Sequence, residues 1–394
     1  MMILGGVLFL LPVALAAYAY ALYPALLRAI AVRRRSPQLA DPAIWPMLTI
    51  TVPAYNEEST IRTAIEGLLA LDYPTDRRHI VVISDASTDR TDDIVREFSG
   101  LGVELLRMPQ RKGKSAAENA AGAVIRGEIV VNTDATIRIP RNALKALIRV
   151  FQDPTVGVAS GRDVSIGQEA IEGNSAESGY VGYEMWVRSL ETRVDSIVGA
   201  SGCFYAIRAA IYDSEFPQEL SRDFASAILA KEHGLRAVSV QEARCLVPRT
   251  VSLESEYRRK VRTMARGLET LWYKRHMMNP RRYGLFAFML VSHKLCRWLV
   301  PLLLPLAPIG LAVASEQSLV ARSGFFLAVA LLVAGLIGWR WPHRRRAPML
   351  LAVPGYLVAA VAAAFAAWTK ALRHQHNALW EPTRRPALPA QKIV

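Results

Sequence analysis

Three groups of acidic and amide residues stand directly after short apolar runs of the chain. Tyr55, Asn56 and Glu57 form the first group, Asp85 opens the second, and Asp134 closes the third. In a parallel sheet, residues that follow successive strands gather along a single edge, and such sheets bind their ligands there. A carboxylate at this edge can accept hydrogen bonds or coordinate a hard divalent cation. We therefore expect a polar ligand site in which Asp85 and Asp134 supply the acidic groups.

The elements that must position these residues alternate between strands and helices. Short runs rich in Val and Ile predict strands, and apolar residues three or four positions apart predict helices. The predicted strands cover 48–53, 79–84, 103–107 and 128–132, and the predicted helices cover 57–71, 88–98 and 115–125. Because this alternation forms a parallel sheet covered by helices on both faces, the predicted fold class is α/β.

Hydrophobic residues make up 52% of the 394-residue chain and are concentrated at its two ends. Residues 1–30 carry one charged side chain, Arg28, and three arginines follow at 33–35. An apolar run of this length with a basic end is typical of a membrane helix whose C-terminal end lies in the cytoplasm. Further spans are predicted at 299–314, 324–341 and 348–368.

Two courses are open to the last predicted span. A crossing would leave Lys370 and Arg373 on the side opposite the arginines at 344–346, against the positive-inside rule. A turn at Pro354-Gly355 would instead form a re-entrant hairpin. Because the segment is mostly apolar and long enough to span a bilayer, we expect a crossing.

Residues 285–300 combine an apolar background with several charged and polar side chains. This composition predicts an amphipathic helix in the membrane interface, with His293 and Lys294 directed towards the soluble domain. A buried structural histidine at 293 is an equally good interpretation.

The formal net charge of +14 does not indicate a nucleic-acid partner. Much of the basic charge lies beside the apolar segments, where anionic headgroups attract each basic residue by about 1 kcal/mol. The three cysteines, Cys203, Cys245 and Cys296, lack the paired spacing of metal sites or disulfide frameworks. We interpret them as reduced thiols.

Seven short motifs then occur in order along the soluble region. They are Val52-Pro53-Ala54-Tyr55-Asn56-Glu57, Ser84-Asp85-Ala86-Ser87-Thr88-Asp89, Lys112-Gly113-Lys114, Thr133-Asp134-Ala135, Gly199-Ala200-Ser201-Gly202, Arg222-Asp223-Phe224 and Arg259-Lys260-Val261-Arg262. In this order the chain resembles the membrane-bound family 2 glycosyltransferases, which include cellulose, hyaluronan and poly-N-acetylglucosamine synthases. The resemblance implies a GT-A-type, Rossmann-like nucleotide-sugar-binding domain plus α-helical transmembrane segments.

The resemblance also implies which residues contact the sugar donor. These are Pro53, Tyr55, Asn56, Glu57, Asp85, Lys114, Asp134, Arg259 and Arg262. Asp85 would accept hydrogen bonds from uracil or ribose, although it could instead cap the following helix. Asp89 is equally well interpreted as a cap or as a ligand contact.

Asp134 matches the family residue that holds a divalent metal on the donor diphosphate. Its hard oxygen ligands would suit Mg2+ or Mn2+. The family motif has a second carboxylate two positions later, and this chain has Thr136 there. The donor phosphates would then have to supply most of the coordination. A carboxylate that merely caps a turn is the alternative role.

Asp223 matches the family's catalytic base, which takes a proton from the acceptor hydroxyl in an inverting transfer. The family usually has an acid before this residue, whereas this chain has Arg222, and removal of a like charge should keep the base more acidic. An acid that only favours the start of the predicted helix at 224–233 is the alternative.

The small residues Gly199, Ala200, Ser201 and Gly202 would let the backbone approach an acceptor sugar closely, as in the acceptor loop of the similar synthases, although a tight turn is the alternative. Arg259 and Arg262 are three apart and can share a helix face towards the diphosphate. A basic helix at the lipid headgroups is their other interpretation.

The resemblance implies an inverting hexosyltransferase that uses a nucleotide-sugar donor, a UDP-hexose or UDP-N-acetylhexosamine, and a lipid-linked or glycan acceptor. Polymerising relatives have Trp where this chain has Thr263, which favours single or limited additions in exopolysaccharide or glycolipid assembly. A processive synthase that exports its product is the alternative, and an inactive nucleotide-sugar-binding scaffold is the alternative of another class. The sequence indicates no particular oligomer or accessory subunit.

The expected organisation is a multi-pass protein of the inner membrane with a cytoplasmic catalytic domain and contact with the lipid bilayer. The expected parts are an N-terminal transmembrane helix at 1–32, a GT-A domain at 47–282, an interfacial helix at 283–298, transmembrane helices at 299–370 and a tail at 371–394.

Overall fold

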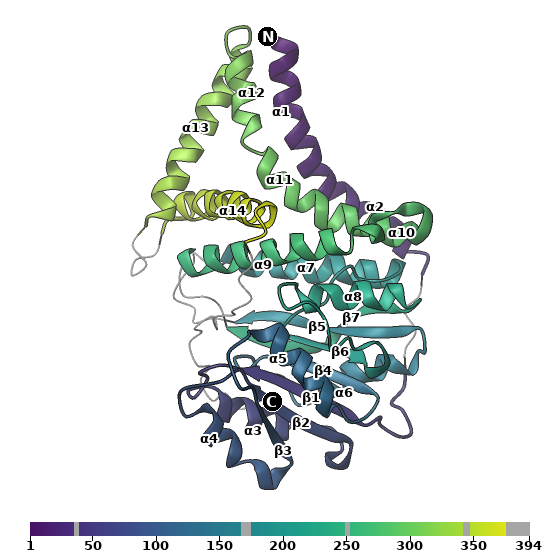
Figure 1. The fold of residues 1–394 in the computed structure, drawn as a ribbon. Helices are drawn as coiled ribbons and strands as arrows, with labels where there is room; N and C mark the ends of the chain where they lie inside the picture. The colour runs from purple at the N-terminus through teal and green to yellow at the C-terminus, as the bar shows by residue number, and fades with distance from the viewer. Residues whose placement is uncertain (35–38, 167–174, 249–252, 342–346, 376–394) are drawn as a thin grey trace.

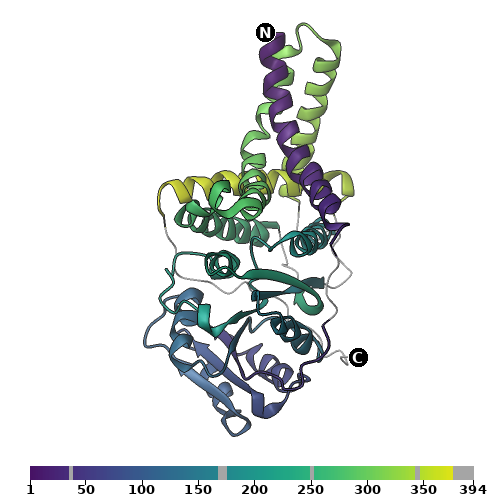
Figure 2. The ribbon, with the colours of Figure 1, turned by 90° about the vertical axis from the view of Figure 1, so that its right-hand side faces the viewer.

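The computed structural model describes residues 1–34, 39–166, 175–248, 253–341 and 347–375. An α/β body lies at one end and a group of long apolar helices at the other (Figures 1 and 2). Most of the predicted tail, including Trp380, lies outside the described residues.

A seven-stranded sheet in the order β3-β2-β1-β4-β6-β5-β7 forms the centre of the body. The strands are β1 (Leu48–Ala54), β2 (Arg78–Ser84), β3 (Val103–Arg107), β4 (Ile129–Thr133), β5 (Val156–Ile166), β6 (Phe204–Arg208) and β7 (Arg236–Pro248). The first four are parallel, as predicted, whereas β6 runs antiparallel to both β4 and β5. The strands nearest the apolar helices are β5 and β7, and β3 is the farthest (Figure 1).

Helices cover both faces of this sheet because each presents an apolar stripe to it. They are α3 (Ile61–Leu69), α4 (Thr91–Arg96), α5 (Lys114–Ala121), α6 (Ala143–Arg149), α7 (Ser175–Val194) and α8 (Arg222–Glu232). A further helix, α9 (Leu253–Tyr273), packs against α8 and the apolar helix α14. On α3, for example, Ile61, Ile65 and Leu68 are buried against strands such as β1, whose Ile50 is 1% exposed. Each fully buried side chain of this size contributes about 1.5–3 kcal/mol. The predicted helices were longer than the observed ones. The first two begin later because the residues before them form turns or bends at the sheet edge, and the third ends at Ala121, where a 3-10 turn follows.

Short 3-10 turns connect several of these elements. They are η2 (Thr75–Arg77), η3 (Ser99–Leu101), η4 (Gly122–Val124), η5 (Val150–Gln152), η7 (Ala209–Ile211) and η8 (Arg275–Met278).

The apolar end of the molecule contains α1 (Met2–Ala17), α2 (Tyr23–Ala31), α10 (Pro280–Leu290), α11 (Arg297–Leu303), α12 (Leu306–Ala314), α13 (Leu319–Trp339) and α14 (Met349–Leu372). Within the described residues, four helical stretches are long and apolar enough to cross a membrane: Met2–Ala31, Pro280–Leu303, Leu319–Trp339 and Met349–Leu372. The sequence predicted that an interfacial helix ends at 298 and a membrane span begins at 299. In the structure the helix is continuous across this point, and the break comes later, at Leu304 and Pro305.

Close backbone contact joins the N-terminal helix to the C-terminal group. A Cβ placed on Gly5 of α1 would lie 2.7 Å from the carbonyl oxygen of Gly310 on α12. Small residues at such crossings let helices pack tightly in an apolar medium, where burial from water gives no driving force.

The course of α14 excludes one of the two courses considered for it. The helix runs unbroken from Met349 to Leu372, so the alternative of a hairpin turn at Pro354-Gly355 is wrong, while its length and hydropathy fit the expected crossing. Pro354 lies in the second turn, where its missing N–H removes one hydrogen bond without ending the helix. In both views α14 lies across the direction of α1 and α13 (Figures 1 and 2). It is fixed to the layer below by the Lys260 Nζ to Tyr356 hydroxyl hydrogen bond of 2.7 Å.

Two π-helical turns face each other where the apolar helices meet the body. They are η1 (Tyr18–Leu22), between α1 and α2, and η9 (Val291–Cys296), between α10 and α11. The hydroxyls of Tyr18 and Ser292 lie 2.7 Å apart, and Tyr183 of α7 donates to the carbonyl of Tyr20 at 2.8 Å. A π turn leaves main-chain carbonyls without regular helical partners, and side chains from the neighbouring element occupy them here.

His293 of η9 points into the body and is 2% exposed. Its Nδ1 lies 2.6 Å from Glu191 Oε1 and its Nε2 lies 3.0 Å from Glu184, both on α7. The predicted direction of His293 is therefore confirmed, and the residue is also buried, as the other interpretation held.

Candidate active site

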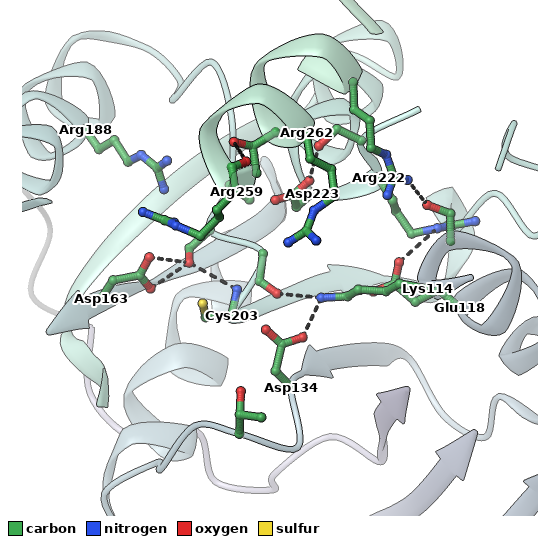
Figure 3. A pocket seen from close by; sticks show the side chains of 18 of the residues that line it. Lys114, Glu118, Asp134, Asp163, Arg188, Cys203, Arg222, Asp223, Arg259 and Arg262 are labelled. Atoms are coloured by element: carbon green, nitrogen blue, oxygen red, sulfur yellow. Dashed lines mark hydrogen bonds and ion pairs between the residues drawn. The ribbon is translucent and has the colours of Figure 1, made fainter. Parts of the chain in front are cut away.

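A cavity of about 280 Å3 lies at the carboxyl ends of β1 and β4, under α9 (Figure 3). Nine of the predicted site residues line it: Glu57, Lys114, Asp134, Ala200, Ser201, Gly202, Asp223, Arg259 and Arg262. The structure thus brings together residues from six of the seven motifs.

Lys114 connects two sides of this cavity. It opens α5 after Gly113, and its Nζ donates to Asp134 Oδ1 at 2.6 Å and to the carbonyl of Gly202 at 3.0 Å. Burial by itself would lower the pKa of Lys114, but the carboxylates of Asp134 and Glu118 outweigh it and hold the pKa above its usual value. The ammonium group is therefore charged and fixed between the end of β4 and the small-residue loop.

The end of β4 fits a divalent cation whose other ligands come from a bound phosphate. Asp134 and Thr136 both line the cavity, so a carboxylate and a hydroxyl stand two residues apart on its wall. Lys114 pairs with this carboxylate at 2.6 Å, so a divalent ion at Asp134 would have to displace the ammonium group. No group of three His, Cys, Asp or Glu that could hold a metal alone occurs in the described part of the chain. A cation here needs ligands that the donor would supply.

Glu118 lies one turn after Lys114 on α5 and is 2% exposed. Its carboxylate lies 4.0 Å from Lys114 Nζ and 3.7 Å from Arg222 Nε. Burial raises the pKa of Glu118, and the two cations only partly offset that effect. Arg222 is itself held over the rings of Tyr212 and Phe216, so it serves the buried packing and does not point freely into the cavity.

Asp223 stands in the first turn of α8, where an acid is favoured by the helix dipole. Its Oδ1 accepts a hydrogen bond of 2.5 Å from the Ser221 hydroxyl. Its main-chain carbonyl accepts from the amide of Ala200 at 3.2 Å. The start of α8 is therefore tied directly to the small-residue loop that faces it.

Gly202 explains why this loop has no side chain beside Asp223. A Cβ at 202 would lie 2.5 Å from Asp223 Oδ2, which is closer than real carbon and oxygen atoms approach. The adjacent Ser201 donates its hydroxyl to Asp163, 2.6 Å from Oδ1, and its amide to Ser160 at 2.8 Å. The loop thus sets the distance between Asp223 and the wall formed by β5.

The basic residues of α9 form the side of the cavity nearest the apolar helices. Arg259 is paired with Glu256 at 2.8 Å, and Arg262 lies one turn further on (Figure 3). Arg266 donates to the Leu220 carbonyl and the Ser115 hydroxyl, each at 2.6 Å, and burial lowers its pKa. Arg266 therefore braces the wall, while Arg259 and Arg262 remain the two predicted donor contacts on this helix.

Five predicted site residues do not line the cavity: Pro53, Tyr55, Asn56, Asp85 and Gly199. Asp85 is 1% exposed, and its two oxygens accept the amides of Lys112 and Gly113, each at 2.7 Å. In this arrangement Asp85 orders the loop before Lys114, and its contact with a base or ribose stays a prediction.

The first-strand residues are similarly engaged with the protein. Pro53 is buried inside β1, and the ring of Tyr55 lies 3.9 Å from the guanidinium of Arg111. Asn56 accepts the amide of Thr88 at 2.8 Å, and Asp89 accepts the amide of Thr91, the first residue of α4, at 3.0 Å. Gly199 faces Phe224 and Lys294, behind the cavity wall.

Several lining residues had not been predicted: Ser115, Glu118, Asp163, Arg188, Cys203, Ser221 and Arg266. A signal existed for Glu118, because it stands four positions after Lys114 and must share its helix face. No comparable signal existed for Arg188 on α7 or Asp163 on β5, which come from elements without a motif. They reach the cavity only through the packing of α7 and β5 against the loop at 199–202.

Comparison with known proteins shows which family model part of this chain matches and which solved fold it resembles. Residues 49–213 match the family model described as Glycosyl transferase family 2. A beta-monoglucosyldiacylglycerol synthase from Synechocystis sp. is 30% identical over 199 residues, which is 46% of this chain and 41% of that protein. The probable glycosyltransferase YdaM from Bacillus subtilis is 34% identical over 123 residues, which is 30% of this chain and 29% of that protein. The similarity thus spans less than half the length of either relative.

Among solved structures, the mannosyltransferase PcManGT from Pyrobaculum calidifontis, in complex with GDP-Man and Mn2+, is similar with a TM-score of 0.71 at 24% identity. The match covers 94% of this chain and 100% of that one. This likeness shows the fold, a mixed α/β sheet of GT-A type accompanied by apolar helices, and confirms the predicted fold class.

Proposed function

We propose, on the premise that residues 49–213 match the Glycosyl transferase family 2 model, that the protein is an inverting hexosyltransferase. It takes a sugar from a nucleotide-sugar donor, a UDP-hexose or UDP-N-acetylhexosamine, and adds it to a lipid-linked or glycan acceptor. The observation that carries the proposal is that Lys114, Asp134 and Asp223 line one cavity at the sheet edge.

Asp223 acts as the base in this proposal. It removes the proton from the acceptor hydroxyl as that oxygen attacks the anomeric carbon from the side opposite the departing diphosphate. Ser221 and the absence of a side chain at Gly202 support this role, because together they fix the carboxylate beside the loop that would hold the acceptor. Positioning of this kind lets the attacking oxygen and the carboxylate meet without rearrangement.

The donor diphosphate is proposed to lie between Asp134 and the arginines of α9. Asp134, assisted by Thr136, would hold a divalent ion, Mg2+ or Mn2+, and such an ion neutralises charge on the departing diphosphate. Lys114 and the guanidinium groups of Arg259 and Arg262 would bind the phosphate oxygens. The relative PcManGT was solved with Mn2+ and GDP-Man, which supports a metal-dependent donor site of this type.

We propose that the catalytic body is cytoplasmic and that the apolar helices lie in the inner membrane. The arginines after α2 favour this orientation. Because α14 lies across α1 and α13, it is proposed to lie in the cytoplasmic interface rather than to cross. Its exposed residues Leu350, Val353, Leu357 and Phe365 recur on one face, which supports contact with lipid along the helix. Both ends of α14 would then be cytoplasmic, in agreement with the positive-inside rule.

Single or limited additions to a glycolipid are favoured over processive synthesis. Thr263 lines the cavity where polymerising relatives have a tryptophan, and α14 packs over α9 above it. The name of the Synechocystis relative, a beta-monoglucosyldiacylglycerol synthase, supports a lipid product.

The test is transfer by the purified protein in phospholipid nanodiscs. Nucleotide release is measured with a panel of radiolabelled nucleotide sugars, with and without Mn2+, and products are followed into the lipid phase. We expect one donor to release nucleotide in a metal-dependent way and to label an extracted lipid. Absence of nucleotide release with every donor would refute the transferase assignment.

A further inference from the structure

We propose that the cavity contains, beside the donor site, a subsite for the phosphate group of a lipid-linked acceptor, built around Arg188. The inference rests on the proposed function and names the chemical class of its acceptor.

Arg188 is a buried cation that opens onto the cavity. It lies on α7, is 9% exposed, and makes one ion pair, in which its Nε lies 3.3 Å from Glu184 Oε1. Its Nη1 is buried and has no hydrogen-bond partner among the described residues. A buried N–H donor without a partner is costly, so a partner from outside the chain would stabilise it.

The charges around Arg188 are not balanced by the protein. Arg297 Nη1 lies 2.9 Å from Glu184 Oε2, and Lys294 Nζ lies 3.6 Å from Glu184 Oε1. Glu184 thus faces three basic side chains, while Glu191 pairs with His293. Three cations against two carboxylates give the cluster net positive charge even when the imidazole of His293 is neutral. Buried charge of one sign requires a counter-charge, and an anionic ligand at Arg188 would supply it.

Asp163, an acid that lines the cavity, is committed elsewhere. Asp163 accepts the Ser201 hydroxyl, 2.6 Å and 2.7 Å from its two oxygens, and the Cys245 thiol at 3.1 Å. Arg188 lies above Asp163, near Arg259 and across the cavity from Lys114 and Glu118 (Figure 3). The subsite is therefore separate from the donor position proposed at Asp134 and lies beside the loop proposed to hold the acceptor.

A lipid phosphate fits this place better than a group carried by the donor. Guanidinium groups bind phosphate through paired N–H donors, and Arg188 and Arg259 face the same cavity from α7 and α9. These two helices form the layer directly beneath α14 and the other apolar helices (Figure 1). A phosphate at the membrane surface could thus reach Arg188 while its hydrocarbon chain stayed in the bilayer.

The test is binding of soluble lipid probes to the full-length protein in detergent, without any donor. Two matched pairs differ by the phosphate: farnesyl phosphate with farnesol, and lysophosphatidic acid with the corresponding monoacylglycerol. We expect the phosphate member of at least one pair to bind at least tenfold more tightly than its alcohol. The pair that shows this preference identifies the isoprenoid or the glycerolipid as the source of the phosphate.

Arg188→Gln should abolish the preference for phosphate and leave binding of the alcohol unchanged. Arg188→Lys should keep part of it, because the charge remains but the paired donors are lost. Arg193→Gln is the matched control on the same helix, since Arg193 donates to the Ala31 carbonyl and does not line the cavity. It should keep the full preference.

Thermal unfolding separates binding from a structural role. Removing one cation from a net-positive buried cluster should leave the ligand-free melting temperature of Arg188→Gln unchanged or higher. A clear drop in that temperature, equal affinity of the wild type for phosphate and alcohol, or an unchanged preference in Arg188→Gln would each overturn the proposal.

A last comparison uses UDP-glucose and UDP-glucuronate as donors. If Arg188→Gln loses activity only with UDP-glucuronate, the anion belongs to the donor sugar and the lipid-phosphate subsite is refuted. Failure of the proposed function would give a different result. If the wild type binds lipid phosphate through Arg188 but releases no nucleotide from any donor, the phosphate subsite is supported and the transferase assignment is refuted.

Discussion

The two sides of the cavity differ in how their charges are balanced. On the sheet side, Lys114 is paired with Asp134 and lies near Glu118, and Arg222 compensates Glu118 in turn. On the helix side, Glu184 is shared between several cations that reach it from α7 and from the segment entering the apolar helices.

This difference in charge balance indicates that the two sides of the cavity are prepared for ligand binding in different ways. The sheet side is a set of opposite charges that neutralise one another before a ligand arrives, so binding there requires exchange of partners. The helix side holds surplus positive charge in a buried place, so binding there completes the balance. The helix side should therefore need less reorganisation than the sheet side when an anionic ligand enters.

The largest effect is expected on the sheet side, from Asp223→Asn. Removal of a general base costs about 10²–10⁴ in rate, while the donor contacts remain. Turnover should therefore be abolished at nearly unchanged nucleotide affinity, as measured by nucleotide release and by equilibrium binding of UDP. Retention of a tenth or more of wild-type turnover would show that Asp223 is not the base.

The corresponding change on the helix side is Glu184→Gln, which should destabilise the folded protein. Its loss leaves the basic groups of α7 and η9 without their shared partner, and breaking a buried ion pair costs about 3–5 kcal/mol. Glu254→Gln, which removes the exposed pair with Arg258, is the control and should cost less than about 1 kcal/mol. Chemical unfolding of both variants measures the contrast, and equal losses would remove the distinction between buried and exposed pairs.

The same carboxylate should make stability depend on acid pH. Burial alone would raise the pKa of Glu184, but His293 and Lys294 outweigh burial and hold the pKa well below its usual range. Its contribution is thus present above the unfolded value of about 4.3 and is lost as pH falls through the folded pKa. The wild type should lose melting temperature below that value more steeply than Glu184→Gln.

A smaller effect on the sheet side is expected from Gly202→Ala. The new methyl group would press on Asp223 Oδ2, and a displacement near 1 Å in an active site can cost about a hundredfold in rate. Gly67→Ala is the control, because a Cβ there meets nothing within 4 Å and favours the helix. Steady-state turnover of both variants checks the prediction, and it fails if Gly202→Ala is as active as the control.

Asp134→Ala should weaken metal-dependent donor binding by more than the roughly tenfold that loss of an outer-shell partner costs. Lys114 would also lose its partner at 2.6 Å. Donor affinity is measured with and without Mn2+. If the metal strengthens binding equally in the variant and the wild type, Asp134 is not a ligand.

The last prediction concerns the topology of α14, which packs over α9 on the helix side of the cavity. With α14 in the interface, Ala347→Cys and Ala387→Cys should both be protected from an impermeant maleimide in intact cells, while Ser318→Cys should react. Reaction at 387 alone would show that α14 crosses the membrane, and reaction at 347 would reverse the proposed orientation.

The sequence predicted the sheet side well and the helix side poorly, for a physical reason. Asp134 and Asp223 stand beside strand and helix ends, so local patterns place them at the sheet edge. Arg188 lies in the middle of a helix with Glu184 four positions away, a spacing typical of ordinary surface pairs. The neighbouring acids of α7, Glu184 and Glu191, contact His293 of η9, about a hundred positions later in the chain, and no local pattern encodes that contact.

The course of α14 could not be predicted for a related reason. Length and hydropathy are the same for a helix that crosses a bilayer and one that lies along it. The decision comes from partners such as Tyr356, which meets Lys260 of α9, and Trp368, which donates to the Trp298 carbonyl at 3.1 Å. The antiparallel strand β6 was missed because its order in the sheet is set by tertiary packing.

The π turn η1 affects how the N-terminal helix responds to deletion of a residue. Such a turn holds one residue more than an α-helical turn, so deletion of a single residue between Tyr18 and Leu22 would let α1 and α2 join as one regular helix. Because the π turn already absorbs this extra residue, its deletion would leave the rotation of α1 about its axis nearly unchanged. A deletion within the regular helix between Gly5 and Ala17 would instead rotate Gly5 by about 100°, away from the backbone of Gly310. Single-residue deletions are therefore tolerated better in this short segment than elsewhere in α1.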